Sequence, residues 1–449
     1  MQSLCIHPDG HYLMTASGEP FFYLGDTAWD IFQKLTLTEM EEYFAARARQ
    51  GFTVLQCVLL NGTEPLDWPN PYGRHAVNLP YTALDYNEDW WQRVEEALKI
   101  AEKYGLTLGL VPMWQAKYID PDHTLFTGYD PAYSYGKFLG TRYRDNANLI
   151  WILGGDVEVK PHMEPIFRGL SDGIKAGEGA GHRHLITFHP RGISDTITEL
   201  GGDRDYLDFL TCQSGHTVGA YEPYRLLEIM RPAGKPMLDA EAHYEEHVTN
   251  WLPQLPTWDA FDIRMGAYES ILAGACGQTY GNPIVAFFLR DRADLERCPY
   301  YVGNLSESAL ETKNWRTSLE CDGANQLHIL KNLRLSRPYF DLRPAQELVL
   351  NSRDDLLFGR ISAARGEDYA YIYTPFGREI EVDASQFSAE ILRASWLNPR
   401  TGEEKGICCF SPRKALFVPP TQGRGQDWLL ILESAEAPWV EVRQPTSQN

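Results

Sequence analysis

Residues 149–156 read Leu-Ile-Trp-Ile-Leu-Gly-Gly-Asp: five apolar residues, two glycines and one carboxylic acid. A short, continuously apolar run that glycine brings to an end is typical of a strand buried on both faces of a parallel sheet. Asp156 follows this run directly, so it should stand where the chain leaves the sheet. The stretch therefore predicts parallel β-structure with an acidic side chain at the carboxyl end of one strand.

Similar apolar runs recur on both sides of this stretch, and helical patterns separate most of them. Alternation of strand, helix and strand with nearly continuous apolar strands indicates a parallel sheet whose faces are covered by helices. Eight such units that close on themselves form a (β/α)8 barrel, the TIM-barrel fold, in which the carboxyl ends of the strands build the active site. The eight expected strands are residues 21–24, 53–60, 106–113, 149–153, 184–188, 207–212, 236–240 and 277–280.

Two of the intervening helices have clear boundary signals. Thr38 and Glu41 match a capping box, which would begin a helix that ends before Gly51. Apolar residues over 91–101 recur at spacings of three and four, and Gly105 would end this second helix. Both helices are the expected crossovers between the first three strands.

The chain changes character after about residue 338. Short runs that alternate apolar and polar residues, with turn residues between them, occur at 369–373, 379–382, 416–418 and 428–432. This pattern predicts a small antiparallel β-sandwich. We therefore expect an α/β chain with a catalytic (β/α)8 barrel over residues 1–340 and a C-terminal β-sandwich domain over residues 341–449.

Composition and charge narrow the class of partner. The chain has 449 residues, of which 43% are hydrophobic, so it can bury a large core. Its formal net charge of −20 disfavours nucleic acid, because binding a polyanion needs a face rich in Lys and Arg. No stretch is long and apolar enough for a membrane span, and the N-terminal residues do not resemble a signal peptide. We expect a cytoplasmic protein with a small substrate and with neither nucleic acid nor membrane as partner.

Glu241 is the second acid that stands at the end of an expected strand, after the apolar run 236–240. Glycosidic cleavage uses one carboxyl group to protonate the leaving oxygen and another to attack, or to stabilise the oxocarbenium-like transition state. The fourth and seventh strands of a barrel face each other across its mouth, so Asp156 and Glu241 could approach the same bond. This pair predicts a glycoside hydrolase.

Other roles for these acids stay open on the sequence alone. Asp156 could cap the helix that follows it, and Glu241 could be a salt-bridged residue at the rim of the barrel. Asp239 has the same side-chain parity as Glu241 and would lie deeper in the barrel, where a structural acid is expected. We keep Asp239 as the reserve candidate for catalysis.

The other strand ends carry residues that suit a sugar. Imidazole, amide and hydroxyl groups can hydrogen-bond sugar hydroxyls, and indole rings offer flat apolar faces. The two histidines and Gln213 could equally be ordinary core residues, and aromatic residues at a barrel rim are also ordinary packing, although we favour Trp29 and Trp114 as sugar contacts. The candidates for substrate binding are Asp26, Trp29, Asn61, Trp114, His189, Gln213, His216, Tyr244, Tyr280 and Asn282.

Two other classes of protein compete with the glycosidase hypothesis. Residues 243–247 read His-Tyr-Glu-Glu-His, which matches the H-x-x-E-H pattern of one zinc peptidase class. That pattern needs a helix that presents His243 and His247 on one face, whereas this segment follows a strand end. We therefore disfavour a metal-dependent hydrolase and expect neither metal nor cofactor. A barrel that binds carbohydrate without cleaving it is the other alternative, and the intact acid pair argues against it.

Several motifs together resemble a known enzyme family. They are Gly-Asp-Thr-Ala-Trp at 25–29, Gly-Phe-Thr at 51–53, Trp-Ile-Leu-Gly-Gly-Asp at 151–156, Gln-Ser-Gly-His at 213–216, Glu-Ala-His-Tyr-Glu at 241–245 and the stretch 274–282. This set resembles the DUF4038 or apiosidase-like glycoside hydrolases, family GH140. Residues 396–402 and 427–433 resemble the C-terminal sandwich of that family, sometimes labelled a collagen-binding domain.

The resemblance implies a retaining exo-hydrolase in which Asp156 is the catalytic acid/base and Glu241 is the nucleophile. The characterised activity of the family is release of terminal D-apiose from side chains of pectic rhamnogalacturonan II. This chain departs from the family at Ala242, where the family usually has proline. We expect it to release apiose or another pentofuranoside from an imported oligosaccharide or a small glycoside.

Overall fold

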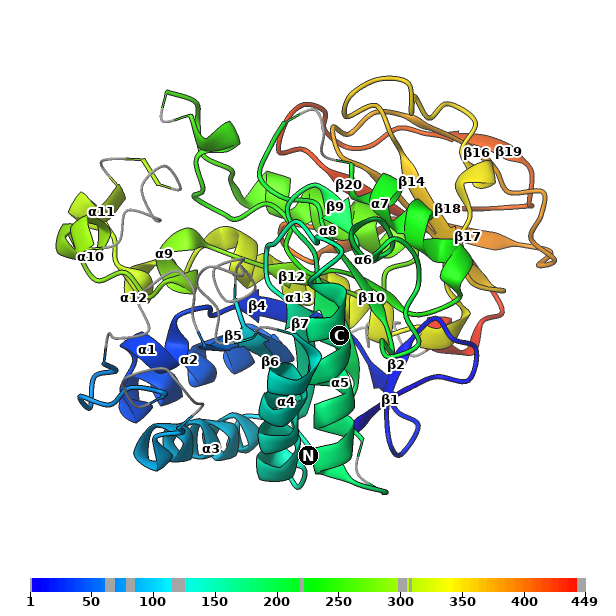
Figure 1. Cartoon of the computed structure of the whole chain (residues 1–449). Helices are drawn as coiled ribbons and strands as arrows, with labels where there is room; N and C mark the ends of the chain where they lie inside the picture. The colour runs from blue at the N-terminus through cyan, green and yellow to red at the C-terminus, as the bar shows by residue number, and fades with distance from the viewer. Residues whose placement is uncertain are drawn as a thin grey trace.

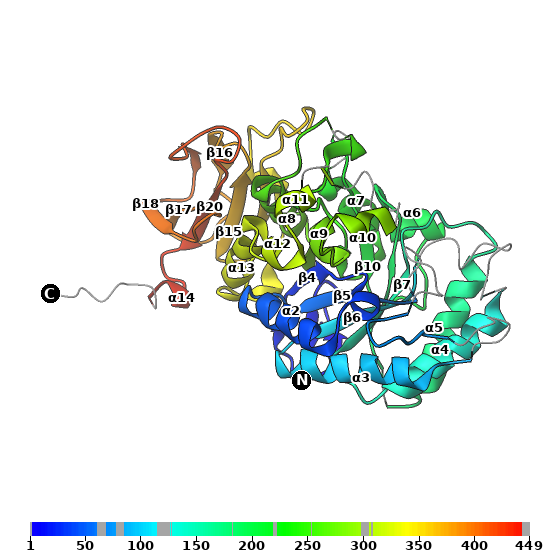
Figure 2. The same cartoon turned by 90° about the vertical axis from the view of Figure 1, so that its left-hand side faces the viewer.

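The computed structural model describes most of the chain, and Figures 1 and 2 show it in two views. A core of strands with surrounding helices makes up the N-terminal part, and a smaller β-structure from the C-terminal part lies against one side of it. The described residues are 2–60, 69–77, 85–114, 126, 128–181, 183–218, 222–252, 254–297, 305–306 and 309–441.

The parallel strands of the barrel correspond one to one with the expected strands. They are β4 (Tyr23–Thr27), β5 (Val54–Leu60), β6 (Thr107–Met113), β7 (Leu149–Gly154), β8 (Ile186–His189), β10 (Leu210–Gln213), β11 (Met237–Asp239) and β12 (Gly277–Tyr280). Their order is β8-β7-β6-β5-β4-β12-β11-β10, and the short strand β9 (Ser194–Asp195) pairs antiparallel with β10. Strands β8 and β10 meet where the sheet closes, and Thr187 Oγ1 donates to Phe209 O there at 2.7 Å. The predicted (β/α)8 barrel is confirmed.

The first barrel strand begins later than the sequence predicts. The apolar pattern places a strand over residues 21–24, whereas β4 begins at Tyr23. Phe21 instead belongs to β3 (Pro20–Phe21), which pairs with β2 (Leu13–Thr15) in a small antiparallel sheet completed by β1 (Leu4–Ile6). Two strands that follow each other closely share one apolar run, so periodicity alone could not separate them.

Helices connect the strands and cover the outside of the barrel (Figure 1). Within α3, the residues of the predicted apolar stripe are all buried, and Gly105 follows the helix with a φ of 72°. The connecting helices are α2 (Leu37–Arg49), α3 (Glu88–Lys103), α4 (Tyr129–Tyr143), α5 (Glu164–Glu178), α6 (Thr196–Leu200), α7 (Pro223–Met230) and α8 (Ala260–Leu272). After β12 come α9 (Pro283–Ala286), α10 (Arg292–Arg297), α11 (Ala309–Thr312), α12 (Trp315–Ser318) and α13 (Asp322–Leu335).

Helix α2 begins two residues before the predicted start. Its N-cap is Thr36, whose Oγ1 accepts from Glu39 N at 3.3 Å, while Glu39 Oε2 accepts from Thr36 N at 2.9 Å. The predicted capping pair has the same spacing, but Thr38 already lies inside the helix. The short helix α1 (Ile31–Lys34) ends at Lys34 with Leu35 as its C-cap, which leaves Thr36 in the extended conformation that an N-cap requires.

The C-terminal part forms antiparallel sheets, as the sequence predicts. One six-stranded sheet has the order β13 (Arg343–Pro344), β14 (Ser362–Arg365), β15 (Tyr369–Thr374), β20 (Trp428–Ser434), β17 (Leu392–Leu397) and β18 (Glu404–Phe410). A second sheet pairs β16 (Ile380–Asp383) with β19 (Lys414–Phe417). The last helix, α14 (Pro438–Glu441), follows β20.

The two faces of the six-stranded sheet have different partners. On β15, Tyr371 and Tyr373 belong to the core that the barrel residues form, whereas Ala370 and Ile372 belong to a second core with residues of β16 and β19. Successive side chains of a strand point to opposite faces, so one face packs on the barrel and the other closes the sandwich. Tyr373 stacks on Tyr268 of α8 with ring centroids 4.8 Å apart. The sandwich is therefore built onto the barrel.

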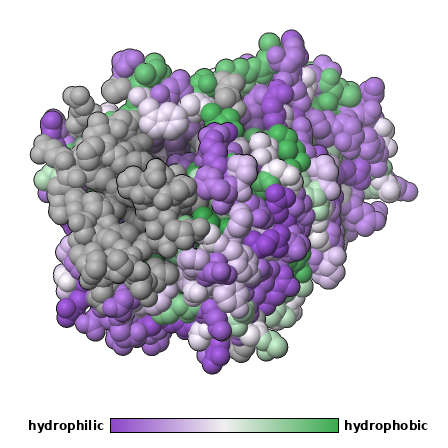
Figure 3. All heavy atoms as spheres, in the orientation of Figure 1, coloured by the Kyte–Doolittle hydropathy of each residue, from purple (hydrophilic) through white to green (hydrophobic). Residues whose placement is uncertain are grey.

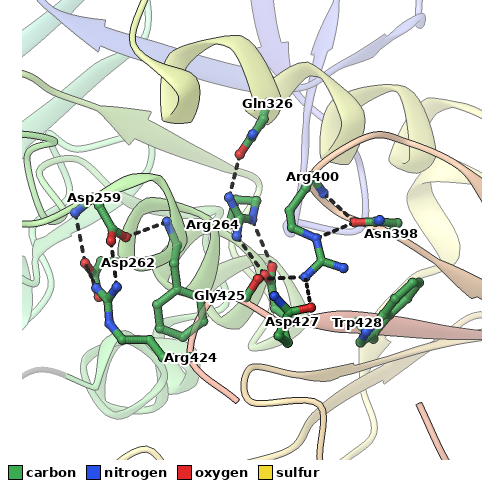
Figure 4. A network of polar contacts seen from close by, with 12 residues as sticks. Asp259, Asp262, Arg264, Gln326, Asn398, Arg400, Arg424, Gly425, Asp427 and Trp428 are labelled. Carbon is green, nitrogen blue, oxygen red and sulfur yellow. Dashed lines mark hydrogen bonds and ion pairs between the residues drawn. The ribbon is translucent and has the colours of Figure 1, made fainter. Parts of the chain in front are cut away.

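Polar contacts also join the two parts, as Figure 4 shows, and the pair of Arg264 with Asp427 is buried. Arg264 of α8 donates from Nε and Nη2 to the two carboxylate oxygens of Asp427 at 2.9 and 2.7 Å. Arg424 lies 2.6 Å from both Asp259 and Asp262, which stand at the start of α8. A bidentate arginine–carboxylate pair fixes orientation as well as distance, so it sets the angle of the sandwich on the barrel.

Hydrophilic residues predominate among the described atoms on the face seen in Figure 3. Among the described helices, none combines the length and the apolar character that a membrane-spanning segment needs.

Candidate active site

A pocket of about 290 Å³ opens at the carboxyl ends of the barrel strands. Both predicted catalytic acids line it, and so do five of the residues predicted to bind substrate. These seven residues are Trp29, Trp114, Asp156, Gln213, His216, Glu241 and Tyr244.

Glu241 follows β11 and is held by two histidines. Its Oε1 lies 3.2 Å from His216 Nε2, and its Oε2 lies 3.2 Å from His189 Nε2. Burial by itself would raise the pKa of the Glu241 carboxyl, but the contacts with both histidines outweigh that effect and lower the pKa to about 2. Glu241 is therefore an ionised carboxylate at neutral pH. Its partners are two buried imidazoles, of which only His216 lines the pocket, so Glu241 is not the salt-bridged rim residue of the alternative role.

Asp156 has a backbone conformation that few residues adopt. Its φ is 51°, after Gly154 at 81° and Gly155 at 127°. A Cβ at Gly154 would lie 2.5 Å from His189 O, and a Cβ at Gly155 would lie 2.9 Å from the Trp114 ring. The two glycines thus let the chain turn tightly against its neighbours and bring Asp156 into the pocket.

Burial raises the pKa of Asp156, and the nearby charge of Glu241 raises it further. The two acids in the pocket therefore have pKa values displaced in opposite directions. The next helix, α5, begins with Met163 as its N-cap, so Asp156 does not cap it. That alternative is wrong.

Aromatic rings form the inner wall of the pocket. The Trp29 and Trp114 rings are 4.5 Å apart between centroids, and His189 packs edge-on against both. Trp29 Nε1 donates to Tyr244 OH at 2.9 Å. Such rings offer flat apolar faces beside groups that can hydrogen-bond hydroxyls.

Asp239 lies behind the pocket and does not line it. Ser214 Oγ donates to Asp239 Oδ2 at 2.6 Å, and the side chain of Asp239 is fully buried. Burial raises the pKa of Asp239 to about 6, against the opposing effect of the Ser214 hydrogen bonds. Gly215 N donates to Glu241 O at 3.1 Å. The residues that follow β10 are therefore hydrogen-bonded both to Asp239 of β11 and to Glu241, which comes just after β11. The contacts fit the structural role expected for Asp239.

Three residues predicted to bind substrate do not line the pocket, namely Asp26, Tyr280 and Asn282. Asp26 accepts hydrogen bonds from Tyr43 OH and Arg47 Nε of α2, both at 2.5 Å, inside the core. Tyr280 OH donates to Glu245 Oε2 at 2.8 Å.

Asn282 is the N-cap of α9 and accepts from Ile284 N at 2.9 Å. Asp26, Tyr280 and Asn282 are each directed to the outer layer or to a helix start, so the prediction that they contact substrate needs correction. His189 touches Glu241 from behind the pocket wall and is fully buried. The last candidate, Asn61, lies outside the described residues.

The histidines of the H-x-x-E-H pattern are not presented by a helix. His243 Nδ1 lies 2.6 Å from Gly215 O, and its ring stacks on Trp258 at 3.9 Å. His247 Nδ1 lies 2.7 Å from Val248 O, and Glu246 between them has a φ of 72°. The described residues hold no group of three or more His, Cys, Asp or Glu side chains placed to bind one metal ion. The pattern in this segment therefore lacks the geometry of that zinc site.

Seven further residues line the pocket that the sequence does not predict as catalytic or substrate-binding. Most of them come from loops or very short helical turns, where periodicity carries no signal, although His247 also belongs to the H-x-x-E-H pattern. The exposed aromatic Trp251, the last residue of the short 3-10 helix η3 (Thr249–Trp251), has no distinguishing sequence pattern around it. These residues are Gly192, Ile193, Gly215, His247, Trp251, Pro283 and Phe287.

Comparisons with known proteins agree with this site. Residues 7–341 match the family model described as "Apiosidase-like, catalytic domain", and residues 344–433 match one described as "Putative collagen-binding domain of a collagenase". No curated protein matches the chain.

Solved structures of glycoside hydrolases are similar to this chain. A glycoside hydrolase family 5 protein from Bacteroides vulgatus is 29% identical over 98% of this chain and 96% of its own, with a TM-score of 0.88. Another structure, described as a glycoside hydrolase, is 30% identical over 98% of both chains, with a TM-score of 0.86. An exo-β-1,4-mannosidase from an Opitutaceae bacterium shares the fold at 15% identity over 74% of this chain and 63% of its own, with a TM-score of 0.50. The chain belongs to the apiosidase-like family and is a glycosidase.

Proposed function

We propose that this protein is a retaining, exo-acting glycoside hydrolase that releases one terminal sugar, apiose or a similar pentofuranose, from an oligosaccharide or a small glycoside. One observation carries the proposal: two carboxyl groups share a pocket and have pKa values displaced in opposite directions. The pKa of Glu241 is lowered to about 2, and the pKa of Asp156 is raised. Because the two pKa values are shifted in opposite directions, Glu241 can attack as a carboxylate and Asp156 can donate a proton as a carboxylic acid.

The first chemical step uses both groups. Asp156 gives its proton to the glycosidic oxygen as the bond from that oxygen to the anomeric carbon breaks. Glu241 forms an ester bond to the anomeric carbon from the opposite face. In the second step the Asp156 carboxylate takes a proton from water, the water oxygen attacks the anomeric carbon, and Glu241 leaves as a carboxylate. Two inversions at one carbon retain its configuration.

The size and lining of the pocket support removal of a single sugar. A volume of about 290 Å³ is at the small end for ligand pockets, and the buried rings of Trp29 and Trp114 stand on its wall. None of the described residues that line it is a Lys or an Arg, which favours an uncharged sugar over a uronic acid. The match to an apiosidase-like catalytic domain supports a pentofuranose.

The same proposal divides the chain into a catalytic barrel over residues 1–340 and a sandwich over residues 341–449. The two family matches, which end at 341 and begin at 344, support this boundary. One face of the six-stranded sheet packs on the barrel, and this contact supports a structural role for the sandwich domain.

The decisive experiment combines a substrate panel with variants of the two acids. Nitrophenyl glycosides, including apiosides and arabinofuranosides, should identify a cleaved sugar, and NMR of the first product should show the same anomer as the substrate. Glu241→Ala should abolish turnover, and azide should restore it with formation of a glycosyl azide of inverted configuration. Asp156→Ala should retain activity only on substrates with good leaving groups.

Glu158→Gln is the matched control, because Glu158 is an exposed acid close to Asp156. Near-parent rates in both Glu241→Gln and Asp156→Asn would overturn the assignment. A sugar that binds by calorimetry and is never cleaved would favour the non-catalytic alternative.

A further inference from the structure

Two apolar side chains stand exposed at the mouth of the pocket. Trp251 is 45% exposed and Ile193 is 40% exposed, and both line the pocket. Trp29 and Trp114, on the inner wall, are only 2% and 3% exposed. The pocket therefore has one pair of rings that is buried and a separate apolar surface that meets solvent.

The backbone holds both exposed residues in the left-handed region. Ile193 has a φ of 56°, and Trp251 has a φ of 54° directly after Asn250 at 55°. β-branched and bulky residues avoid this region, so the surrounding structure must impose it. Conformations of this kind gather at ligand-binding sites, where the geometry of a side chain matters more than the strain.

Hydrogen bonds fix these two backbone segments around the exit of β10. Ile193 N donates to Gln213 O at 2.8 Å, and Asn250 N donates to His216 O at 3.2 Å. Asn250 Oδ1 accepts from Val218 N at 2.8 Å. Ile193 and Trp251 are thus attached to the same short segment, which also carries the His216 ring that contacts Glu241.

The ring of Trp251 is positioned by two histidines. Its centroid lies 5.7 Å from that of His216 at an interplanar angle of 70°, and 5.4 Å from that of His247 at 89°. His216 and His247 stack on each other at 4.3 Å. This packing holds the Trp251 indole next to a partner of the nucleophile, within reach of whatever projects from the pocket.

We infer that Trp251 and Ile193 form the leaving-group subsite and bind a ring with a flat apolar face. The inference rests on the proposed function: in an exo-acting pocket the terminal sugar occupies the inner end, so the next ring of the substrate lies at the mouth. An aryl aglycone and the C–H face of a second sugar share the required chemistry, because both can stack on an indole.

Three substrates of one glycone test this inference: its methyl glycoside, its nitrophenyl glycoside and a disaccharide that carries it at the non-reducing end. Trp251→Ala should lower kcat/KM about tenfold on at least one of the two ring-bearing substrates and less than about twofold on the methyl glycoside. Which ring-bearing substrate is affected distinguishes an aryl from a sugar leaving group. Leu252→Ala is the control, since Leu252 is 42% exposed beside Trp251 and does not line the pocket.

Ile193→Gly gives a second, independent variant. Glycine accepts the left-handed backbone, so thermal stability should be kept or raised while kcat/KM falls on the same ring-bearing substrate. An equal effect of Trp251→Ala on all three substrates, or no effect on any, would overturn the subsite. If the parent protein cleaves no glycoside at all, the proposed function fails and the subsite fails with it, whereas an active parent with unselective variants refutes the subsite alone.

Discussion

His216 Nε2 lies 3.2 Å from Glu241 Oε1, and the same imidazole stacks on His247 and packs against Trp251. One side chain thus links the proposed nucleophile to the mouth of the pocket. His189 contacts the other oxygen of Glu241. The carboxylate is therefore fixed from two sides, which holds it ionised and in one orientation.

Removal of His216 should shift the ionisation of Glu241. Burial would then raise the pKa of Glu241 without the opposing effect of His216, so the acid limb of kcat/KM should move up by about 1 pH unit or more. The measurement is the pH profile of kcat/KM for His216→Asn against the parent. His162→Asn serves as the control, because His162 is exposed. An unchanged acid limb would contradict the role given to this contact.

The alkaline limb of the same profile should belong to Asp156. The proposed mechanism needs Asp156 protonated and Glu241 ionised, so activity should fall as pH rises through the raised pKa of Asp156. It should not fall on the acid side until the pH approaches the Glu241 pKa of about 2 or the protein unfolds. In Asp156→Ala, assayed on an activated aryl glycoside, the alkaline limb should disappear. Its persistence would assign the proton donor to another group.

Gly154→Ala should impair activity beyond its effect on backbone strain. A Cβ there would meet His189 O at 2.5 Å, and any displacement moves Asp156 or His189. Gly179→Ala is the matched control, because Gly179 has a similar φ of 76° and a Cβ added to it would meet no neighbouring atom within 4 Å. Both variants should lose about 1–3 kcal/mol of unfolding free energy, because a non-glycine residue is strained at positive φ. Only Gly154→Ala should lose most of its kcat/KM, and equal activities would argue against a tight turn at Asp156.

Asp427→Asn should loosen the sandwich from the barrel. The change leaves the buried Arg264 guanidinium without its carboxylate partner, which lowers the free energy of unfolding by about 3–5 kcal/mol in comparable buried pairs. Chemical denaturation measures the loss. Asp355→Asn removes the partner of Arg353 in an exposed pair and should change stability by less than about 1 kcal/mol. Similar decreases in the free energy of unfolding of the two variants would contradict the role of Asp427 in holding the sandwich on the barrel.

Glu269→Gln should flatten the dependence of stability on pH. Burial raises the pKa of Glu269 to about 8, against an opposing effect of Arg360. The folded state therefore keeps a proton that the unfolded chain releases near its ordinary pKa, and stability falls as pH rises between about 4 and 8. Over that pH range, the free energy of unfolding of the parent should fall by several kcal/mol more than that of Glu269→Gln. Parallel stability curves for the two proteins would contradict this shift.

The helix boundary at α2 illustrates what spacing can and cannot decide. Thr36 with Glu39 and Thr38 with Glu41 fit the capping pattern equally well, and only the end of α1 at Lys34 selects the first pair. The side chains at the strand ends raise the same difficulty. Barrel strands are apolar toward both the interior and the helices, so alternation does not reveal which face a polar residue such as Asp26 takes.

The amino-acid sequence by itself determined the barrel, its eight strands and the two acids that follow the fourth and seventh, because buried parallel strands are continuous apolar runs and a polar residue at their ends is conspicuous. Only the tertiary structure decided that Asp26, Tyr280 and Asn282 bind other parts of the protein, and that Trp251 and Ile193 reach the pocket. Loop residues distant in the chain are brought together by packing and by hydrogen bonds across strands, and no local pattern of residues encodes those partners.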